Sequence, residues 1–230
     1  MEHKFLITGI GSGLGKYLFE NLPNSIGLSR DTFNLIKNED YDTIIHCAFN
    51  KENNITDYFK YLEDNIFLTQ NLLKLKYRKF IYISTIDVYP ENPSNYGLFK
   101  RFAESIVNKY TNTTILRCSM ILGNGTKPNH VTKLKDNIPS LGLSGESTFN
   151  YILNKDILGF VKLPEYPKGI IDFVANNYIK LSNTKKILQS STELGDYVYS
   201  SNFEYSNPIY KLYEEFNISS LENLKRYLND

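Results

Sequence analysis

The first twenty residues constrain the fold more than any other part of the chain. They open with a short apolar run, residues 4–8 (KFLIT), and end in a helical pattern over residues 13–21. Between the two lies a glycine-rich turn, residues 9–15 (GIGSGLG). A strand that enters a helix through such a turn is one βα unit, and successive units of this kind build a parallel sheet. The opening segment therefore predicts an α/β fold.

The glycine-rich turn is also a candidate phosphate-binding site. Glycines permit a tight turn, a close approach of main-chain N–H groups to a pyrophosphate, and close packing of the helix on the strand. The helix N-terminus adds a partial positive charge. A plain strand–helix turn is the alternative, because glycine-rich turns are common. The expected dinucleotide contacts are Gly9, Gly11, Ser12, Gly13, Leu14 and Gly15.

The remainder of the chain alternates between strand and helix patterns. Strands are predicted at residues 25–29, 42–46, 80–84 and 114–117, and helices at residues 56–75 and 96–110. This alternation indicates a doubly wound parallel sheet with helices on both faces. We expect residues 1–123 to form the dinucleotide-binding core and residues 124–230 to form a small substrate-binding lobe, interleaved with the core in a single structural unit. Within the lobe, a loop is predicted at residues 136–147, strands at 149–153, 170–174 and 197–200, and helices at 157–163, 181–188 and 221–228.

Composition excludes several classes of function. The 230 residues, 41% hydrophobic and 22% charged, allow one substantial globular core. The 26 basic and 25 acidic residues leave a formal charge of +1, so no global field attracts nucleic acid or an anionic membrane. No apolar run reaches the roughly 20 residues of a membrane span, and no signal-peptide pattern is visible. Cys47 and Cys118 are predicted to be buried free thiols, and a cytoplasmic location is expected.

The end of the second predicted strand bears on the choice of cofactor. NAD sites place an Asp or Glu about 20 residues after the glycine turn, where the carboxylate binds the ribose 2′-hydroxyl. Here the strand ends with Arg30, whose guanidinium can bind a 2′-phosphate in a bidentate manner. The sequence therefore favours NADP, with NAD as the other possibility. The alternative is a solvated arginine at the start of a loop, neutralised by Asp31.

A second group of residues has the composition of a proton-transfer site. Tyr96 and Lys100 are four residues apart in a predicted helix and therefore share one face. A nearby ammonium favours the phenolate and lowers the pKa of a tyrosine from its free value of ~10. The tyrosine can then exchange a proton with a carbonyl or alcohol oxygen, to which Thr85 at the preceding strand end can also donate. A ring packed on the core beside a solvated lysine is the alternative, but the order of the motifs favours catalysis.

With these motifs the chain resembles the extended short-chain dehydrogenase/reductase family, which comprises sugar-nucleotide epimerases, dehydratases and reductases. Residues 42–48 (DTIIHCA) look like the third strand of that family, residues 65–73 like its central helix, and residues 96–100 like its Tyr-Gly-x-x-Lys helix. Residues 115–123 look most like dTDP-4-dehydrorhamnose reductases. The resemblance implies a Rossmann-type fold with a structural His46 and no metal site. It also implies catalytic roles for Thr85, Tyr96 and Lys100 and further cofactor contacts from Ala48, Ser84, Tyr96 and Lys100.

The chain departs from the family pattern at positions that bear on the reaction. Extended members usually have a glycine in place of Ser12, and many have an asparagine in place of Met120. Family dehydratases commonly carry an acid–base pair directly after the catalytic threonine, where this chain has Ile86 and Asp87. Asp87 is thus either a lone base or a solvated loop residue. The C-terminal portion is also short.

The resemblance implies reduction of a keto-sugar nucleotide by NADPH, with Tyr96 as the general acid. An NAD(P)-dependent 4-epimerase or dehydratase is the second hypothesis, and a non-catalytic NADP-binding sensor or scaffold is the third. A homodimer formed through the helices at residues 56–75 and 96–110 is also implied, with no nucleic-acid or membrane partner. The expected substrate contacts are Thr85, Asp87, Ser119, Asn129 and His130.

Overall fold

The computed structural model describes residues 4–29, 32, 39–51 and 55–230. The chain divides into two compact units, Met1–Cys118 with Ile157–Ile171, and Ser119–Asp156 with Asp172–Asp230. The chain therefore leaves the first unit at Cys118 and not at residue 123, the expected boundary. The physical reason is that β6 (Met120–Leu122) pairs in parallel with β9 (Tyr151–Leu153) of the second unit instead of extending the central sheet.

The central sheet has six strands among the described residues, in the order β10-β5-β4-β3-β1-β2. Strands β1 to β5 pair in parallel, with Phe5 beside Ser25 on one side and Thr43 on the other. Every residue of β1 is buried, as is typical of a parallel strand covered on both faces. The predicted doubly wound, Rossmann-type fold is thus confirmed. The strands are β1 (Phe5–Thr8), β2 (Ser25–Leu28), β3 (Asp40–His46), β4 (Lys76–Thr85), β5 (Thr113–Cys118) and β10 (Gly169–Phe173).

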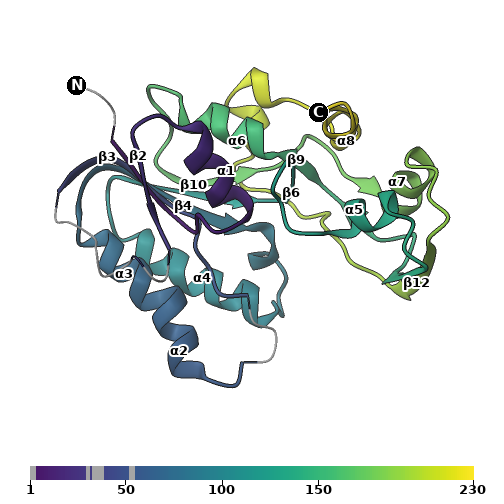
Figure 1. The fold of residues 1–230 in the computed structure, drawn as a ribbon, viewed down its shortest axis with the longest axis horizontal. Helices are drawn as coiled ribbons and strands as arrows, with labels where there is room; N and C mark the ends of the chain where they lie inside the picture. Colours follow the sequence, from purple (N-terminus) through teal and green to yellow (C-terminus); the bar gives the residue numbers. More distant parts are fainter. Residues whose placement is uncertain (1–3, 30–31, 33–38, 52–54) are drawn as a thin grey trace. The chain divides into compact units, whose positions relative to one another are not determined.

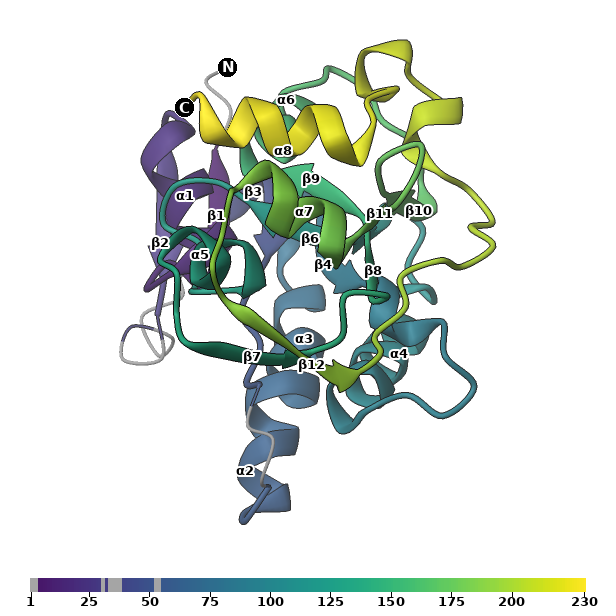
Figure 2. The ribbon, with the colours of Figure 1, turned by 90° about the vertical axis from the view of Figure 1, so that its right-hand side faces the viewer.

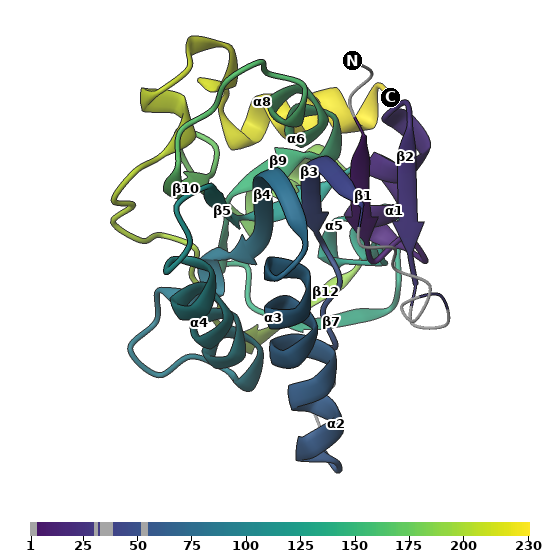
Figure 3. The ribbon, with the colours of Figure 1, turned by 90° about the vertical axis from the view of Figure 1, so that its left-hand side faces the viewer.

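Helices cover both faces of this sheet. Helix α1 (Gly13–Asn21) packs on one face, where the ring of Phe19 approaches Gly27 of β2. Helices α3 (Leu68–Leu73) and α4 (Asn95–Val107) lie on the other face, as Figure 1 and Figure 3 show. The order of the strands reverses at β1, because the chain runs outward to β2 and then returns to β3. In doubly wound folds such a reversal opens a crevice at the carboxyl ends of the strands.

The core beneath α3 and α4 follows the helical spacing of the apolar residues. Leu72 and Leu73 of α3 and Ala103 and Val107 of α4 pack against buried side chains of the sheet such as Phe80. The predicted single helix at residues 56–75 is interrupted. It consists of α2 (Tyr58–Leu62), a π-helical segment η2 (Glu63–Phe67) and α3. Such π-segments are frequent at functional sites.

The second unit contains short strand pairs, three α-helices of its own and two short 3₁₀ helices, Ile209–Lys211 and Glu214–Phe216; Figure 2 shows these elements. The loop predicted for residues 136–147 is wrong in part, because residues 140–143 form a strand whose Leu141 is buried in an apolar cluster. The sequence suggested a loop because Gly142 lies within this strand and Pro139 directly precedes it. The strand predicted at residues 197–200 lies earlier, at Glu193–Tyr197, where it pairs with residues 140–143.

The elements of the second unit are β7 (Ser140–Leu143), β8 (Thr148–Phe149), β11 (Ile179–Lys180), β12 (Glu193–Tyr197), α5 (His130–Lys135), α7 (Leu181–Ile187) and α8 (Ser220–Leu228). Helix α6 (Asn154–Val161) spans the point where the chain returns to the first unit. Cys118 is buried and Cys47 is partly exposed, and both are free thiols. None of the helices in the described ranges combines the length and the apolar character that a membrane crossing requires.

Candidate functional site

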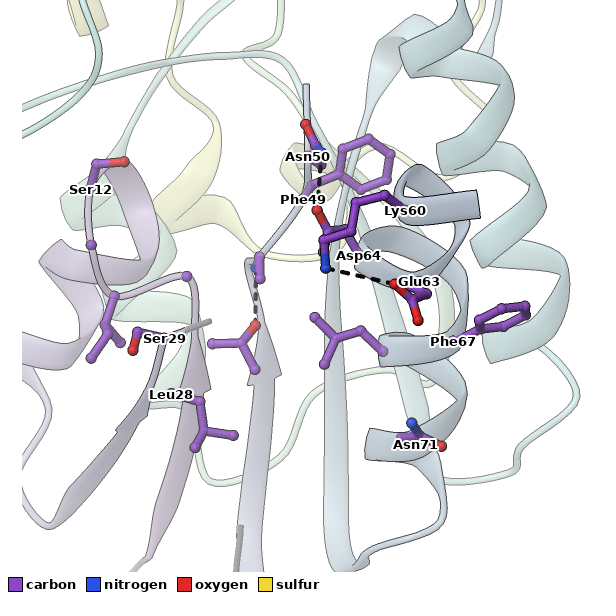
Figure 4. A pocket seen from close by; sticks show the side chains of 16 residues that line it. Ser12, Leu28, Ser29, Phe49, Asn50, Lys60, Glu63, Asp64, Phe67 and Asn71 are labelled. Carbon is purple, nitrogen blue, oxygen red and sulfur yellow. Dashed lines mark hydrogen bonds and ion pairs between the residues drawn. The ribbon is translucent and has the colours of Figure 1, made fainter. Parts of the chain in front are cut away.

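A cavity of about 680 Å³ lies in the first unit at the carboxyl ends of β1, β2 and β3 (Figure 4). This volume is within the usual range for small-molecule and cofactor sites. Its position coincides with the reversal of the strand order. Of the residues predicted to bind the cofactor, Gly9, Gly11, Ser12 and Ala48 line the cavity.

The glycine turn is compact because side chains are sterically excluded from it. Gly9 has φ +76°, and a Cβ at this position would lie 2.9 Å from the main-chain nitrogen of Ala48. A Cβ on Gly15 would lie 2.5 Å from the carbonyl oxygen of Gly9, so α1 packs closely against the turn. Ser12 precedes α1 without a side-chain capping hydrogen bond, so the first-turn N–H groups of the helix receive no acceptor from it. Gly13, Leu14 and Gly15 form that first turn.

A buried hydrogen-bond network fixes the ends of β1 and β3 beside the cavity. Thr8 Oγ1 accepts hydrogen bonds from the main-chain N–H groups of Cys47 (3.1 Å) and Ala48 (3.0 Å). Its own proton therefore goes to Nδ1 of His46 at 2.8 Å. The Nε2–H of that ring then donates to Thr69 at 2.9 Å. Burial lowers the pKa of His46 to about 3, so the ring is neutral, in agreement with its expected structural role.

The opposite wall of the cavity comes from α2, η2 and α3, and the sequence interpretation missed it. Lys60, Asp64 and Asn71 line this wall, with Lys60 Nζ 3.2 Å from the carboxylate of Asp64. Figure 4 shows the lysine side chain extended toward the acidic pair Glu63 and Asp64. The available signal was the spacing of these polar residues, which places them on one face of the helix that follows the third strand.

The candidate proton-transfer residues Thr85, Asp87 and Tyr96 come together at the carboxyl end of β4. Thr85 Oγ1 accepts from the N–H of Asp87 (3.2 Å) and donates to its carboxylate (3.1 Å), capping the 3₁₀ turn η3 (Ile86–Val88). The hydroxyl of Tyr96 is hydrogen-bonded to Thr85. Gly97 makes this approach possible, because a Cβ there would lie 2.2 Å from the carbonyl oxygen of Asp87.

The electrostatics of Tyr96 differ from the sequence-based expectation. Burial raises the pKa of the Tyr96 hydroxyl, and the carboxylate of Asp87 raises it further. The hydrogen bond with Thr85 acts in the opposite direction. The expected lowering of the pKa of Tyr96 by Lys100 is therefore not seen.

The environment of Lys100 gives the reason. Its side chain is buried, and its Nζ donates to the carbonyl oxygen of Ile83 at 2.6 Å. The ammonium lies over the rings of Phe49 (4.3 Å) and Tyr82 (4.6 Å). Burial lowers the pKa of Lys100 to about 7, and the charge of Lys51 lowers it as well. Above that pH the uncharged amine predominates, and an uncharged amine does not stabilise a phenolate.

Ser84 and Arg30 are also predicted to contact the cofactor. Ser84 does not line the cavity; its buried hydroxyl donates to the carboxylate of Glu104, which also forms an ion pair of 2.8 Å with Arg117. Ser84 thus links β4 to α4 and β5. Arg30 lies outside the described residues.

The remaining predicted substrate residues belong to the second unit. Ser119 is buried, and its hydroxyl has no hydrogen-bond partner among the described residues. Asn129 caps α5 by accepting from Val131 N at 2.9 Å. His130 is buried with its Nε2 2.8 Å from the hydroxyl of Tyr151, and burial lowers the pKa of His130 to about 3. Substrate contact by these three residues stays a prediction.

Residues 5–141 match the sequence profile of the NAD dependent epimerase/dehydratase family. No curated protein sequence matches the chain. Among solved structures, dTDP-4-dehydrorhamnose reductase from Bacillus anthracis str. Ames, in complex with NADP, aligns with a TM-score of 0.77 at 17% identity, over 100% of this chain and 98% of that one.

Two other solved structures have a comparable similarity. UDP-N-acetylglucosamine 4-epimerase from Bacillus cereus aligns with a TM-score of 0.75 at 18% identity, over 99% of this chain and 96% of that one. The NAD-dependent NDP-hexosamine 5,6-dehydratase TunA aligns with a TM-score of 0.73 at 18% identity, over 99% of this chain and 97% of that one. At these identities the likeness to the solved structures shows a shared fold.

Proposed function

This chain belongs to the NAD dependent epimerase/dehydratase family, and we propose that it uses NADPH to reduce the carbonyl group of a keto-sugar nucleotide. The observation that carries the proposal is the hydrogen-bonded pair of hydroxyls on Thr85 and Tyr96. Two hydroxyls held together in this way can act on one carbonyl oxygen. Lys100 lies one helical turn from Tyr96 on α4.

The residues around the cavity fit a dinucleotide. A pyrophosphate can approach the main chain at Gly9, where there is no side chain, and the N-terminus of α1, whose first N–H groups are not capped by Ser12. The cavity of about 680 Å³ has room for the two nucleosides. When bound, the reduced nicotinamide supplies a hydride to the carbonyl carbon. Tyr96 would donate its proton to the carbonyl oxygen, and Thr85 would donate a hydrogen bond to that oxygen once its bond to Asp87 is exchanged. Lys100 holds the cofactor ribose once its hydrogen bond to Ile83 is exchanged.

The preference for NADP over NAD rests on the sequence position of Arg30 at the end of the second strand. It is supported by the similar reductase structure, which contains NADP. The helical wall of the cavity carries Lys60 together with Glu63 and Asp64, a net formal charge of −1, so this wall does not favour an additional phosphate. Discrimination between the cofactors is therefore assigned to Arg30.

Reduction is favoured over dehydration by the residues that follow Thr85. Ile86 is apolar and buried, so Asp87 is the sole carboxylate at the two positions where family dehydratases commonly carry a pair. A 4-epimerase or dehydratase is the second candidate, because Asp87 lies close enough to Tyr96 to affect its pKa and could serve as a base.

The proposal includes a homodimer formed through α2, η2 and α4. These elements carry exposed apolar side chains in the first unit, and Phe59 and Phe67 contact each other edge to face with ring centroids 6.2 Å apart. Apolar surface of this kind marks an interaction site. The exposed residues are Tyr58, Phe59, Phe67, Leu98 and Phe102.

The experiment that tests the function incubates the protein with a panel of keto-sugar nucleotides and either NADPH or NADH. The reaction is measured by the loss of nicotinamide absorbance, and the product is identified. We expect consumption of NADPH with one member of the panel and at least tenfold slower consumption of NADH. Tyr96→Phe is the matched control and should consume neither cofactor. Cofactor that survives purification, together with no consumption of added NADPH, would instead identify an epimerase or dehydratase.

A further inference from the structure

The segment that follows β3 brings a second lysine to the candidate catalytic tyrosine. Lys51 Nζ lies 4.3 Å from the centroid of the Tyr96 ring. Lys100, to which the sequence motif assigns the role of neighbouring cation, instead directs its Nζ to the carbonyl of Ile83. The cation over the phenol ring is therefore Lys51.

The main chain that carries Lys51 is held in place by side-chain hydrogen bonds. The N–H of Asn50 donates to Asn65 Oδ1 at 2.7 Å, and Asn65 Nδ2 donates to the carbonyl of Asn50 at 3.2 Å. Asn50 Nδ2 also donates to the carboxylate of Asp64 at 3.0 Å. Asn65 is buried in η2, so the residue preceding Lys51 is fixed to the helical wall of the cavity.

Phe49 completes this arrangement. Its ring meets the Tyr96 ring edge to face, with centroids 5.2 Å apart, and the Lys100 ammonium lies 4.3 Å from the centre of the same Phe49 ring. Phe49 thus contacts both candidate catalytic side chains. The segment 49–51 therefore forms one side of the proton-transfer site, a role that the sequence motifs did not indicate.

The two lysines differ in the cost of carrying charge. Lys100 is 2% exposed, and desolvation disfavours its ammonium form. Lys51 is exposed to water, so its ammonium does not lose its hydration on folding. A cation above a phenol ring is attracted to the ring and more strongly to the phenolate. Lys51 is therefore placed to stabilise the anion that Tyr96 becomes on losing its proton.

We propose that Lys51 is a positioning residue of the reaction, whose ammonium stabilises the Tyr96 phenolate. The inference rests on the proposed function, since it needs Tyr96 to act as the acid. In the reduction, a C–H bond of the reduced nicotinamide would break and the nicotinamide would be oxidised, while the hydride joins the carbonyl carbon and the carbonyl π bond breaks. The Tyr96 O–H bond breaks as its proton joins the substrate oxygen, and the phenolate then regains a proton from water. Lys51 keeps its protons throughout.

The first test is a titration of Lys100 in the cofactor-free full-length protein by NMR with isotopically labelled lysine, assigned with Lys100→Arg. Because the charge of Lys51 lowers the pKa of Lys100, Lys51→Met should raise the midpoint of Lys100, whereas Lys51→Arg should leave it in place. Lys109→Met, at an exposed position on α4's C-terminal side, is the control for removal of a distant charge. An unchanged midpoint in Lys51→Met would overturn the proposal.

The second test is kcat for the reduction at neutral pH. Burial and the carboxylate of Asp87 raise the pKa of Tyr96 above its ordinary value, so Tyr96 is protonated at this pH. Without Lys51 the phenolate is less stable and Tyr96 is a weaker acid. Lys51→Met should therefore lower kcat about three- to tenfold, with KM for NADPH unchanged. Lys51→Arg should restore kcat.

The outcomes separate the two proposals. A loss of kcat that Lys51→Arg does not restore, or a change confined to KM, would contradict the inference, because a structural or substrate-binding lysine has those effects. If the wild type reduces no keto-sugar nucleotide while the Lys100 midpoint moves as expected, the proposed function fails. In that case the proposed role of Lys51 in the reaction also fails. The placement of Lys51 beside Tyr96 and Lys100 is unaffected.

Discussion

The ammonium of Lys100 donates a hydrogen bond of 2.6 Å to the main-chain carbonyl of Ile83. This bond, with the rings of Phe49 and Tyr82, holds a charged group that is 2% exposed at the end of β4. A single carbonyl and two rings do not replace the hydration that the ammonium loses on folding. The pKa of Lys100 is accordingly about 7 in the folded chain, well below the ordinary value for lysine.

This burial predicts a pH-dependent stability. Between the folded-state pKa of about 7 and the unfolded value of ~10.4, the unfolded chain binds one proton more, so the free energy of unfolding rises with pH. The slope contributed by Lys100 is at most about 1.4 kcal/mol per pH unit. Lys100→Met should remove this contribution in urea denaturation at pH 7, 8 and 9, whereas Lys109→Met should keep it. Equal slopes in wild type and Lys100→Met would show that the folded-state pKa is not lowered.

The hydroxyl of Thr8 should contribute measurably to stability. Thr8→Val keeps the shape of the side chain but leaves His46 Nδ1 and the N–H groups of Cys47 and Ala48 without their partner. We expect a loss of about 1–3 kcal/mol in the free energy of unfolding, measured by urea denaturation. Thr8→Ser keeps the hydroxyl and should lose less. A Val variant as stable as the wild type would mean that water replaces the hydroxyl.

Two glycines in helices should respond to alanine in opposite ways. A Cβ on Gly97 would lie 2.2 Å from the carbonyl oxygen of Asp87, so Gly97→Ala should separate η3 from α4, lowering both stability and kcat. A Cβ on Gly159 of α6 meets nothing within 4 Å. Gly159→Ala should stabilise the protein by about 0.5–1 kcal/mol through helix propensity. Thermal unfolding of both variants should give a lower Tm for Gly97→Ala and a higher Tm for Gly159→Ala. Equal shifts in Tm would contradict the packing described for Gly97.

Asp87→Asn should distinguish the two candidate reactions. The carboxylate raises the pKa of Tyr96, so its removal lowers that pKa and leaves the acid intact at neutral pH. A reductase should retain activity within about tenfold, because Asp87 transfers no proton in that reaction. A dehydratase or epimerase that uses Asp87 as its base should lose about a hundredfold or more. The measurement is kcat at pH 7 with Tyr96→Phe as the inactive reference.

The apolar surface of α4 should mediate self-association. Phe102 is 50% exposed, so Phe102→Glu should leave the fold intact while it places a charge in the proposed dimer interface. Sedimentation velocity at micromolar concentration should give a dimer for the wild type and a monomer for this variant. Leu212→Glu changes a comparably exposed residue of the second unit and serves as the control. A wild type that is monomeric would exclude the homodimer.

Prediction from the sequence succeeded where the pattern is local. Helix α1 begins and ends at the residues expected, Gly13 and Asn21, because a glycine turn starts the helix and apolar spacing continues it. Strands β1 to β5 agree with their predicted positions to within a few residues. The strand at 140–143 was missed because its burial depends on an apolar cluster assembled from distant segments. The π-segment within residues 56–75 was also missed.

The sequence by itself determined the alternation of strands and helices and the parallel sheet, because both follow from short-range periodicity. It also determined which elements carry the glycine turn, Thr85, Tyr96 and Lys100, because these positions follow from the order of strands and helices along the chain. Tertiary structure alone decided which cation lies over Tyr96. The pKa of Lys100 depends on the rings and carbonyl that enclose it, and the place of Lys51 depends on hydrogen bonds between Asn50 and Asn65. Desolvation and long-range packing are properties of the folded environment, and no spacing along the chain encodes them.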